Sequence, residues 1–248
     1  MKGLIVGLAN DQSLAWGCVQ ALKAQGAELA ITWQNDKARP HVEPLAKAVG
    51  AEIVLPLDVR DPVQMAEVFE VIRQSWGQLD FLLHSIAYAP KDDLHGRVTD
   101  TSVEGFTIAM DVSCHSLIRL ARQAEPLMTG GGSVLTMSFY GSEKVVPGYN
   151  LMGPVKAALE SSMRYLAAEL GPKAIRVNAL STGPVKTRAA SGLSHFDVLM
   201  EKAADAAPLH QLVTIEQVGE AAAFLLSDKA RFITGQTIYV DSGYNILG

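Results

Sequence analysis

Seven short runs of β-favouring residues alternate with longer helical patterns along the whole chain, and this alternation limits the possible folds more than any single motif. The runs are apolar at nearly every position, which is typical of strands in a parallel sheet covered by helices on both faces. One uninterrupted alternation predicts a single α/β domain over residues 1–248, built on a doubly wound, seven-stranded parallel sheet with helices on both faces. The predicted strands are 3–7, 28–33, 52–57, 79–86, 132–138, 175–180 and 236–240. The predicted helices lie near 13–25, 37–49, 61–76, 101–125, 149–170 and 214–227.

Residues 181–208 form the only long stretch without a clear helical or strand pattern. An irregular segment of this length inside a compact domain is usually either a functional lid or disordered. Its small residues and short apolar patches favour the lid, so we expect this segment to cover a substrate.

Composition and charge narrow the class of partner. The chain carries a formal net charge of −5, so nucleic acids and anionic membranes are not expected to bind it. No apolar run reaches the ~18 residues of a membrane span, and the first residues lack a secretory pattern. The two cysteines, Cys18 and Cys114, have neither C-x-x-C nor zinc spacing, which favours free thiols in a reducing cytoplasm. No cluster of His, Cys, Asp or Glu has the spacing of metal ligands, so no metal is expected.

A glycine turn follows the first predicted strand, in "GLANDQSLAWG" (7–17). Gly7 permits a tight turn, Ser13 stands where a helix cap is needed, and the free N–H groups of a helix start can bind a pyrophosphate. The spacing is not G-x-G-x-x-G, so the motif alone also fits an ordinary strand–turn–helix unit with an incidental Gly17. Its place after the first strand of an α/β sheet favours a Rossmann-like dinucleotide site.

Residues at the ends of the next two strands are candidates for binding the adenosine part of a dinucleotide. Gln34, in "TWQND", can bond a ribose hydroxyl through its amide. Lys37 and Arg39 follow, but neither stands at the strand tip, which favours NADH and leaves NADPH as the less expected cofactor. Asp58, in "LDV", can read an adenine amino group, and it fits equally well as a helix cap.

Tyr149 and Lys156 lie seven positions apart in "YNLMGPVKAALE" (149–160). If this stretch is helical from its first residue, seven steps return the side chains to nearly the same face, two turns along. A phenol beside an ammonium is a candidate catalytic pair. From spacing alone, a buried Tyr beside a solvated Lys is the alternative.

Taken in order along the whole chain, these stretches resemble the divergent branch of the short-chain dehydrogenase/reductase family, and within it the bacterial NADH-dependent enoyl-acyl-carrier-protein reductases. The most specific mark is the Tyr-x6-Lys spacing of Tyr149 and Lys156. Most of the superfamily uses Tyr-x3-Lys, which would put Gly153 where Lys is needed. Further marks are "GLANDQSLAWG", "LDFLLHSIAYAP", "IRVNALSTGPVKTRAASGL" and "TGQTIYVDSGY".

The resemblance implies an oxidoreductase of fatty acid biosynthesis that reduces the trans-2 double bond of an enoyl thioester by hydride transfer from NADH. The thioester would be carried by acyl carrier protein or coenzyme A, and the enzyme would be a cytoplasmic homotetramer. A ketone or alcohol oxidoreductase of the same fold is the alternative. A non-catalytic dinucleotide-binding regulator is a third reading, against which the intact Tyr149 and Lys156 argue.

The resemblance also implies residue roles. Tyr149 and Lys156 would be catalytic, and Leu193 would lie in the loop over the acyl chain. The substrate-binding residues would be Ala89, Phe139, Tyr149 and Phe196. The cofactor-binding residues would be Gly7, Ser13, Leu14, Gln34, Asp58, Val59, Ile86, Lys156, Val185, Lys186, Thr187, Arg188 and Ala189.

One departure from the family pattern lies ten positions before Tyr149. Many of these reductases have a second Tyr there, whereas this chain has Phe139, followed by Tyr140. We expect Tyr140 to be structural, and Phe139 keeps the ketone or alcohol alternative open. Ser138 is a weaker candidate for a group that assists a carbonyl, and His84 is expected to pack rather than to act as an acid or base.

Overall fold

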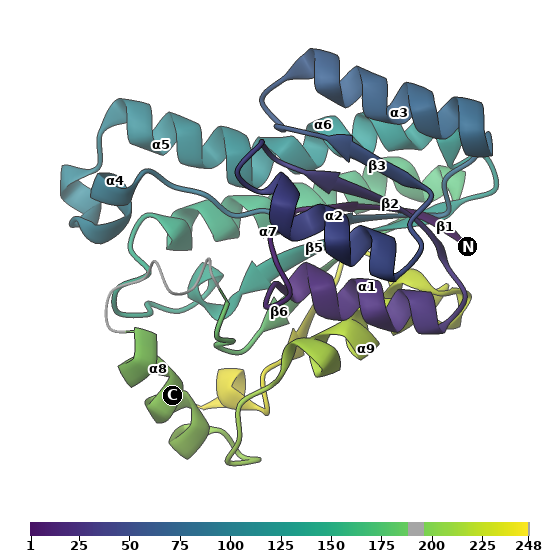
Figure 1. Cartoon of the computed structure of the whole chain (residues 1–248). Helices are drawn as coiled ribbons and strands as arrows, with labels where there is room; N and C mark the ends of the chain where they lie inside the picture. Colours follow the sequence, from purple (N-terminus) through teal and green to yellow (C-terminus); the bar gives the residue numbers. More distant parts are fainter. Residues whose placement is uncertain (188–195, 248) are drawn as a thin grey trace.

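A computed structural model of the chain describes residues 1–187 and 196–247. Its seven strands form one parallel sheet in the order β3-β2-β1-β4-β5-β6-β7 (Figure 1), which confirms the predicted doubly wound α/β fold. The strands are β1 (Lys2–Val6), β2 (Glu28–Trp33), β3 (Ile53–Pro56), β4 (Phe81–His84), β5 (Gly132–Phe139), β6 (Ile175–Thr182) and β7 (Thr237–Val240). The α-helices are α1 (Leu14–Ala24), α2 (Arg39–Ala48), α3 (Pro62–Trp76), α4 (Lys91–His95), α5 (Val103–Met110), α6 (Ser116–Ala124), α7 (Met152–Leu170), α8 (Phe196–Ala206) and α9 (Ile215–Leu226).

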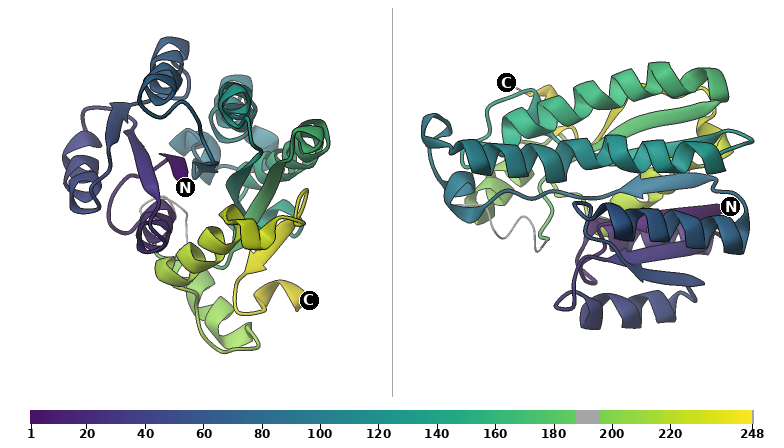
Figure 2. Two further views of the ribbon diagram at one scale, coloured as in Figure 1. Left: turned by 90° about the vertical axis from the view of Figure 1, so that its right-hand side faces the viewer. Right: turned by 90° about the horizontal axis from the view of Figure 1, so that it is seen from above.

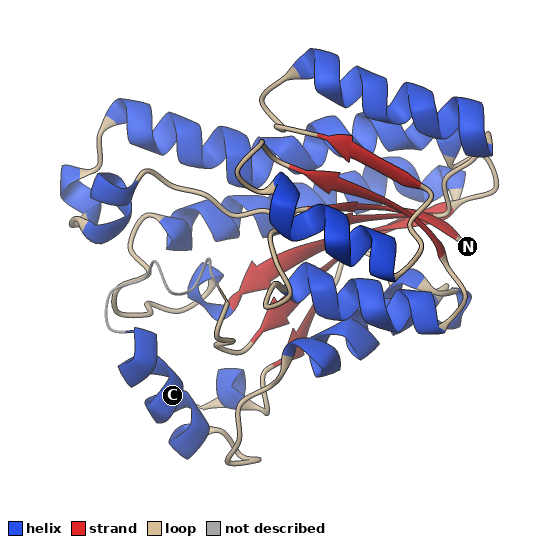
Figure 3. Ribbon diagram, viewed as in Figure 1, coloured by secondary structure: helices blue, strands red, loops and turns tan. Residues whose placement is uncertain are grey.

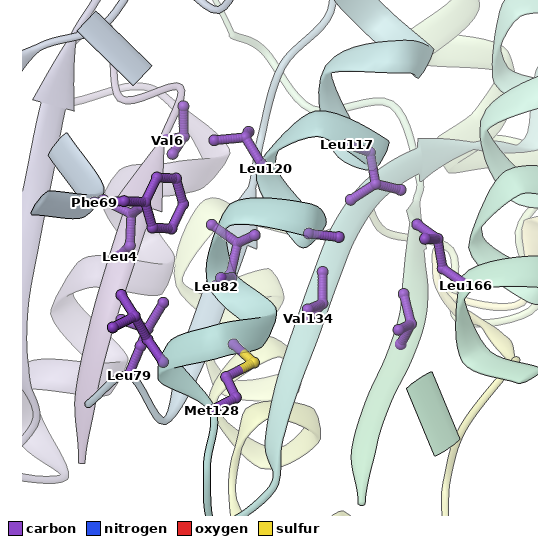
Figure 4. Packing of buried hydrophobic residues seen from close by; sticks show 14 of the residues in the cluster. Leu4, Val6, Phe69, Leu79, Leu82, Leu117, Leu120, Met128, Val134 and Leu166 are labelled. Atoms are coloured by element: carbon purple, nitrogen blue, oxygen red, sulfur yellow. The ribbon is translucent and has the colours of Figure 1, made fainter. Parts of the chain in front are cut away.

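The helices cover both faces of the sheet, and the strands supply side chains to each. In β1, Leu4 and Val6 belong to the core on the α3, α6 and α7 side, whereas Ile5 belongs to the core on the α1 and α9 side. The two views of Figure 2 show the sheet between these helix layers. Figure 4 shows how Leu82 of β4 and Leu117 of α6 pack within the first core. None of the helices within the two described ranges combines the length and apolar character needed to cross a membrane.

The strand order reverses next to β1, which pairs in parallel with β2 on one side and with β4 on the other. All strands run in parallel, so their carboxyl ends lie at one edge, marked by the arrowheads in Figure 3. In open α/β sheets this reversal leaves a crevice outside the carboxyl ends of the two central strands, and ligands bind there.

Helix α7 begins later than predicted. Its first residue is Met152, and Tyr149 lies in the preceding turn, where Asn150 has φ 41°. The expectation that one continuous helix carries Tyr149 and Lys156 is therefore wrong, because the backbone at Asn150 takes a left-handed conformation. The turn, rather than helical periodicity, places the phenol.

The predicted irregular segment 181–208 is also corrected. Strand β6 continues to Thr182, and most of the second half of the segment forms α8. Residues 188–195 lie outside the described part of the chain. The sequence patterns do not predict the five-residue helix α4 either.

The predicted helix 101–125 is present, but it is not regular. A π-helical turn, Asp111–His115, joins α5 to α6 without a break. Such turns are frequent at functional sites, and this one contributes Val112 to the cavity described below.

A close contact between two helices requires glycine at position 17, and the sequence does not reveal this contact. A Cβ on Gly17 would lie 1.9 Å from the carbonyl oxygen of Ile215, at the start of α9. A Cβ on Gly219 would in turn lie 2.2 Å from the carbonyl oxygen of Gly17. The two glycines thus allow α1 and α9 to pack with their backbones in contact.

We expect Gly17→Ala to lower the free energy of unfolding by about 1–3 kcal/mol, because the added methyl group overpacks a backbone contact that cannot yield without moving a helix. Denaturant unfolding measures the change. The control is Gly171→Ala, where the backbone is helical and a Cβ meets nothing within 4 Å. Equal stability of the Gly17 variant and the wild type would contradict this packing.

Candidate active site

A cavity of about 460 Å³ lies at the carboxyl ends of the strands. This is the size range of small-molecule and cofactor sites. Segments that follow β1, β3 and β4 and the ends of β2, β5 and β6 all contribute to its wall. The lining residues are Val6–Ala9, Ser13, Leu14, Thr32, Gln34, Ala38, Leu57, Val59, Ser85–Ala89, Leu94, Val112, Met137–Phe139, Tyr149, Met152, Lys156, Thr182–Val185 and Thr187.

The turn after β1 brings the start of α1 to this cavity. Gly7 has φ +107°, and a Cβ there would lie 2.0 Å from the carbonyl oxygen of Ser85, so only glycine fits. Ser13 is the N-cap residue of α1, but its Oγ accepts from the N–H groups of Ala9 (3.2 Å) and Asn10 (3.0 Å) instead of capping the helix. Among the described residues, the N–H groups of Ala15 and of Leu14, which lines the cavity, have no hydrogen-bond partner and can bind an anion.

The residues predicted to bind a nucleoside lie at the tips of β2 and β3. An exposed Gln34 lines both the main cavity and a shallower hollow beside it, and Asp58 lines the hollow. Arg60 donates to both carboxylate oxygens of Asp58, at 2.8 and 3.2 Å, and this pairing lowers the pKa of Asp58. The helix-cap alternative for Asp58 is wrong, since Asp61 caps α3 by accepting from its first N–H groups.

Arg39, a candidate for binding a 2′-phosphate, already has partners. Its guanidinium carbon lies 5.3 Å from the centroid of the Trp33 ring, and its Nε donates to Glu43 at 2.7 Å. Arg39 is thus engaged with Trp33 and Glu43, and Gln34 is the residue that directly follows β2.

Tyr149 is buried, and its ring is held on two sides. The ring of Phe139 packs edge-on against it at 4.7 Å between centroids, and a Cβ on Gly141 would lie only 2.4 Å from its ring. Among the described residues, no group forms a hydrogen bond with the Tyr149 hydroxyl, which therefore keeps its donor for a ligand in the cavity. Burial raises the pKa of this phenol, so it stays protonated at neutral pH.

Lys156 is only 4% exposed and donates from Nζ to the carbonyl oxygen of Met137 at 2.7 Å. An ammonium has three donors, and one is used in this contact. Desolvation lowers the pKa of Lys156 to about 8. The cavity wall thus brings together a free phenol and a buried ammonium, as the sequence predicts.

Two weaker candidates are engaged elsewhere. Ser138 donates its hydroxyl proton to the carboxylate of Glu160, so this donor is not free for a substrate carbonyl. His84 is fully buried between Thr136 and Ser116, at 2.8 Å from each hydroxyl, and burial lowers its pKa to about 3. It does not line the cavity.

The structure brings most of the predicted site residues together. Lys186 is exposed and does not line the cavity. Arg188, Ala189 and Leu193 lie outside the described residues, and Phe196 is the first residue of α8. The predicted residues in the cavity wall are Gly7, Ser13, Leu14, Gln34, Val59, Ile86, Ala89, Phe139, Tyr149, Lys156, Val185 and Thr187.

The sequence did not identify four of the apolar and aromatic residues that line the cavity. Leu94 of α4, Val112 of the π-helical turn and Met152 of α7 line it together with Tyr88. Apolar residues on helices carry no sign of whether they face a core or a ligand, so no pattern could identify them. Asn150 ties this region to the Tyr149 turn by donating to the carbonyl oxygen of Leu94 at 3.1 Å.

The residues present fit a nicotinamide dinucleotide. The open start of α1 suits a pyrophosphate, Gln34 suits a ribose, and the unused donors of Lys156 suit the hydroxyls of a second ribose. The apolar residues of the wall, such as Leu94, Val112 and Met152, suit an uncharged substrate chain.

Comparisons with known proteins agree with this geometry. A family profile described as "Enoyl-(Acyl carrier protein) reductase" matches residues 7–245. A Rickettsia felis protein named enoyl-[acyl-carrier-protein] reductase [NADH] FabI is 47% identical over 247 residues, 100% of this chain and 95% of that protein. The crystal structure of an Anaplasma phagocytophilum enoyl-(acyl-carrier-protein) reductase in complex with NAD is similar with a TM-score of 0.96 and 48% identity, covering 100% of this chain and 94% of that chain. The Aquifex aeolicus enoyl-[acyl-carrier-protein] reductase (NADH) has the same TM-score and 47% identity, covering 100% and 97%.

Proposed function

The chain belongs to the enoyl-(acyl carrier protein) reductase family, and we propose that it reduces the trans-2 double bond of an enoyl thioester with hydride from NADH, as a step of fatty acid biosynthesis. One observation carries the proposal. The Tyr149 hydroxyl, which has no hydrogen-bond partner among the described residues, lies in the wall of the same cavity as the buried Lys156.

The reaction explains why a phenol is needed. When bound, NADH would supply a hydride to the β-carbon of the substrate, and negative charge would collect on the thioester oxygen as an enolate. The α-carbon would then take a proton from solvent, which completes the saturated thioester. A hydrogen bond from Tyr149 to that oxygen strengthens as the charge develops, so it stabilises the transition state more than the bound substrate. Because burial keeps the phenol protonated, Tyr149 has its proton to donate at neutral pH.

Lys156 stabilises the charge on the thioester oxygen without contacting that oxygen. Its two remaining donors bind the nicotinamide ribose hydroxyls, and its charge raises the positive potential around the developing enolate. The contact with Met137 fixes the ammonium against β5, so its position does not depend on the ligand.

The remaining site assignments are part of the proposal. The start of α1 binds the pyrophosphate, Gln34 the adenosine ribose and Asp58 the adenine amino group. Phe139 and Ala89 contact the acyl thioester. Residues 181–208 cover the substrate, and the domain over 1–248 works as one catalytic unit.

The ketone or alcohol alternative requires a donor for a substrate carbonyl in addition to the phenol. Ser138 is the candidate for that role, and its hydroxyl is bound to Glu160. This contact favours the enoyl thioester over a ketone.

We further propose that the enzyme works in the cytoplasm as a homotetramer on thioesters of acyl carrier protein or coenzyme A. Val103 of α5 and Tyr165 of α7 are 86% and 78% exposed. In the proposed tetramer, these two exposed apolar side chains lie in subunit contacts. The buried, unpaired Cys18 and Cys114 suit a reducing compartment. Light scattering should give four times the 26.5 kDa chain mass, and a monomer would refute the assembly.

The test of the proposed function is NADH oxidation, followed by its absorbance, with a crotonyl thioester and separately with a panel of ketones. We expect turnover with the thioester. Turnover with ketones alone would support the alternative instead, and NADH binding without any turnover would indicate a non-catalytic protein.

A further inference from the structure

Glu160 is a buried carboxylate in the active site that the proposed chemistry does not use. It lies on α7, one helical turn after Lys156, and is 3% exposed. Ser138 and Ser142 donate to its Oε1, the latter at 2.7 Å, and Thr237 donates to its Oε2 at 3.3 Å. Three donated hydrogen bonds suit an ionised carboxylate, which can only accept.

The charge of Glu160 has no counter-ion in direct contact. Within residues 1–187 and 196–247, no Lys, Arg or His forms an ion pair with it. The three hydroxyls are neutral, and a buried carboxylate is costly unless an opposite charge is near. Lys156 also lacks a counter-ion in direct contact, since its only hydrogen bond to the described residues is to the neutral carbonyl oxygen of Met137.

The two charges lie four residues apart on α7. Residues four apart lie on the same side of a helix, and both side chains are directed to the end of β5. There, Ser138 binds Glu160, and the preceding residue, Met137, binds Lys156. In a water-poor interior, two opposite charges attract one another even without contact.

The same carboxylate also fixes the backbone that shapes the site. Ser138 stands between Met137, which holds Lys156, and Phe139, which packs against Tyr149. Thr237 connects Glu160 to β7, two strands away from β5. One side chain therefore connects the carboxyl end of β5, beside both catalytic candidates, to the first residue of β7.

We propose that Glu160 is a positioning residue of this reductase, whose buried negative charge keeps the Lys156 ammonium protonated while its hydrogen bonds hold the end of β5 in place. The consequence for turnover rests on the function proposed above. The effect on Lys156 itself does not require any substrate.

The titration behaviour agrees with this geometry. Burial lowers the pKa of Lys156 to about 8, and Glu160 is the main group that opposes this shift, with a smaller effect of the same sign from Cys114. The other groups near Lys156 carry no charge at neutral pH, because burial raises the pKa of Tyr149 and lowers that of His84 to about 3. Without the Glu160 charge, Lys156 would lose its proton at a lower pH.

The experiment titrates Lys156 directly in the cofactor-free protein by NMR of lysine labelled with ¹³C at Cε, the signal being assigned by its loss in Lys156→Arg. We expect a wild-type midpoint near pH 8. Glu160→Gln, which keeps the shape but removes the charge, should lower the midpoint by about one unit. Glu160→Asp, which keeps the charge, should stay close to the wild type. An unchanged midpoint in Glu160→Gln would overturn the proposal.

Ser142→Ala is the matched control. It removes one hydrogen bond to Glu160 but leaves the charge, so the Lys156 midpoint should move by no more than a few tenths of a unit. An equal shift in Ser142→Ala and Glu160→Gln would mean that packing, not charge, is responsible, and would also overturn the proposal.

A measurement on the wild type covers the case in which Glu160→Gln does not fold. The ¹³Cδ signal of Glu160, assigned by its loss in Glu160→Asp, should show an inflection at the Lys156 midpoint, since coupled groups report one another's titration. Its absence would refute the coupling. If the coupling is present but the wild type reduces no enoyl thioester, the proposed function fails and this inference stands.

Discussion

Replacing Tyr149 with Phe lowers kcat/KM for an enoyl thioester by about 10²–10³ and leaves the Kd for NADH nearly unchanged. The variant keeps the ring that packs against Phe139 and removes only the hydroxyl, so the site keeps its shape. The lost donor acts on charge that exists only in the transition state, which is why the loss falls on turnover. Steady-state kinetics and an NADH binding titration measure the two effects.

The matched control is Tyr140→Phe. Tyr140 is also buried, but it packs against Tyr244 at 5.8 Å between ring centroids and does not line the cavity. Its hydroxyl should therefore have little effect on turnover. If Tyr149→Phe kept full activity, or if Tyr140→Phe lost as much, Tyr149 would not be the enolate donor.

Replacing Lys156 with Met lowers kcat/KM by about 10²-fold and raises the Kd for NADH about tenfold or more, the range expected for lost hydrogen bonds from a charged group. Both values change because Lys156 holds the nicotinamide ribose and also supplies positive potential at the enolate. This pattern separates Lys156 from Tyr149, whose loss spares cofactor binding. The same kinetics and binding titration give the comparison.

Lys144→Met serves as the control for Lys156→Met, because Lys144 is an exposed lysine near the Tyr149 turn and does not line the cavity. Thermal unfolding of both variants shows whether the fold is kept, since Lys156→Met removes a buried cation four residues from the buried Glu160. An unchanged NADH affinity in Lys156→Met would contradict the ribose contact.

The sheet could be predicted from the sequence because its signal is local. Strands buried on both faces are apolar at successive positions, and β2 begins and ends at the predicted residues. The glycine turn could be identified for the same reason, since Gly7 directly follows β1 and precedes α1.

The parts that could not be predicted depend on contacts between distant segments. Gly17 matters because α9 meets α1 there, almost two hundred residues later in the chain. Tyr149 reaches the cavity through a left-handed turn at Asn150, which its helix-like sequence hides. Glu160 lies four residues after Lys156, a spacing that could have drawn attention to it, but its three hydroxyl partners lie 18 to 77 residues away from it in the chain.

The most direct test of the account follows the hydride itself. NADH carrying deuterium on the transferred position of the nicotinamide is mixed with the protein and a crotonyl thioester, and NMR and mass spectrometry locate the label in the product. A cavity that delivers hydride to the β-carbon while Tyr149 stabilises the enolate predicts a butyryl thioester with deuterium at the β-carbon and an intact thioester. Deuterium on the carbonyl carbon, or a product that retains the double bond, would contradict it.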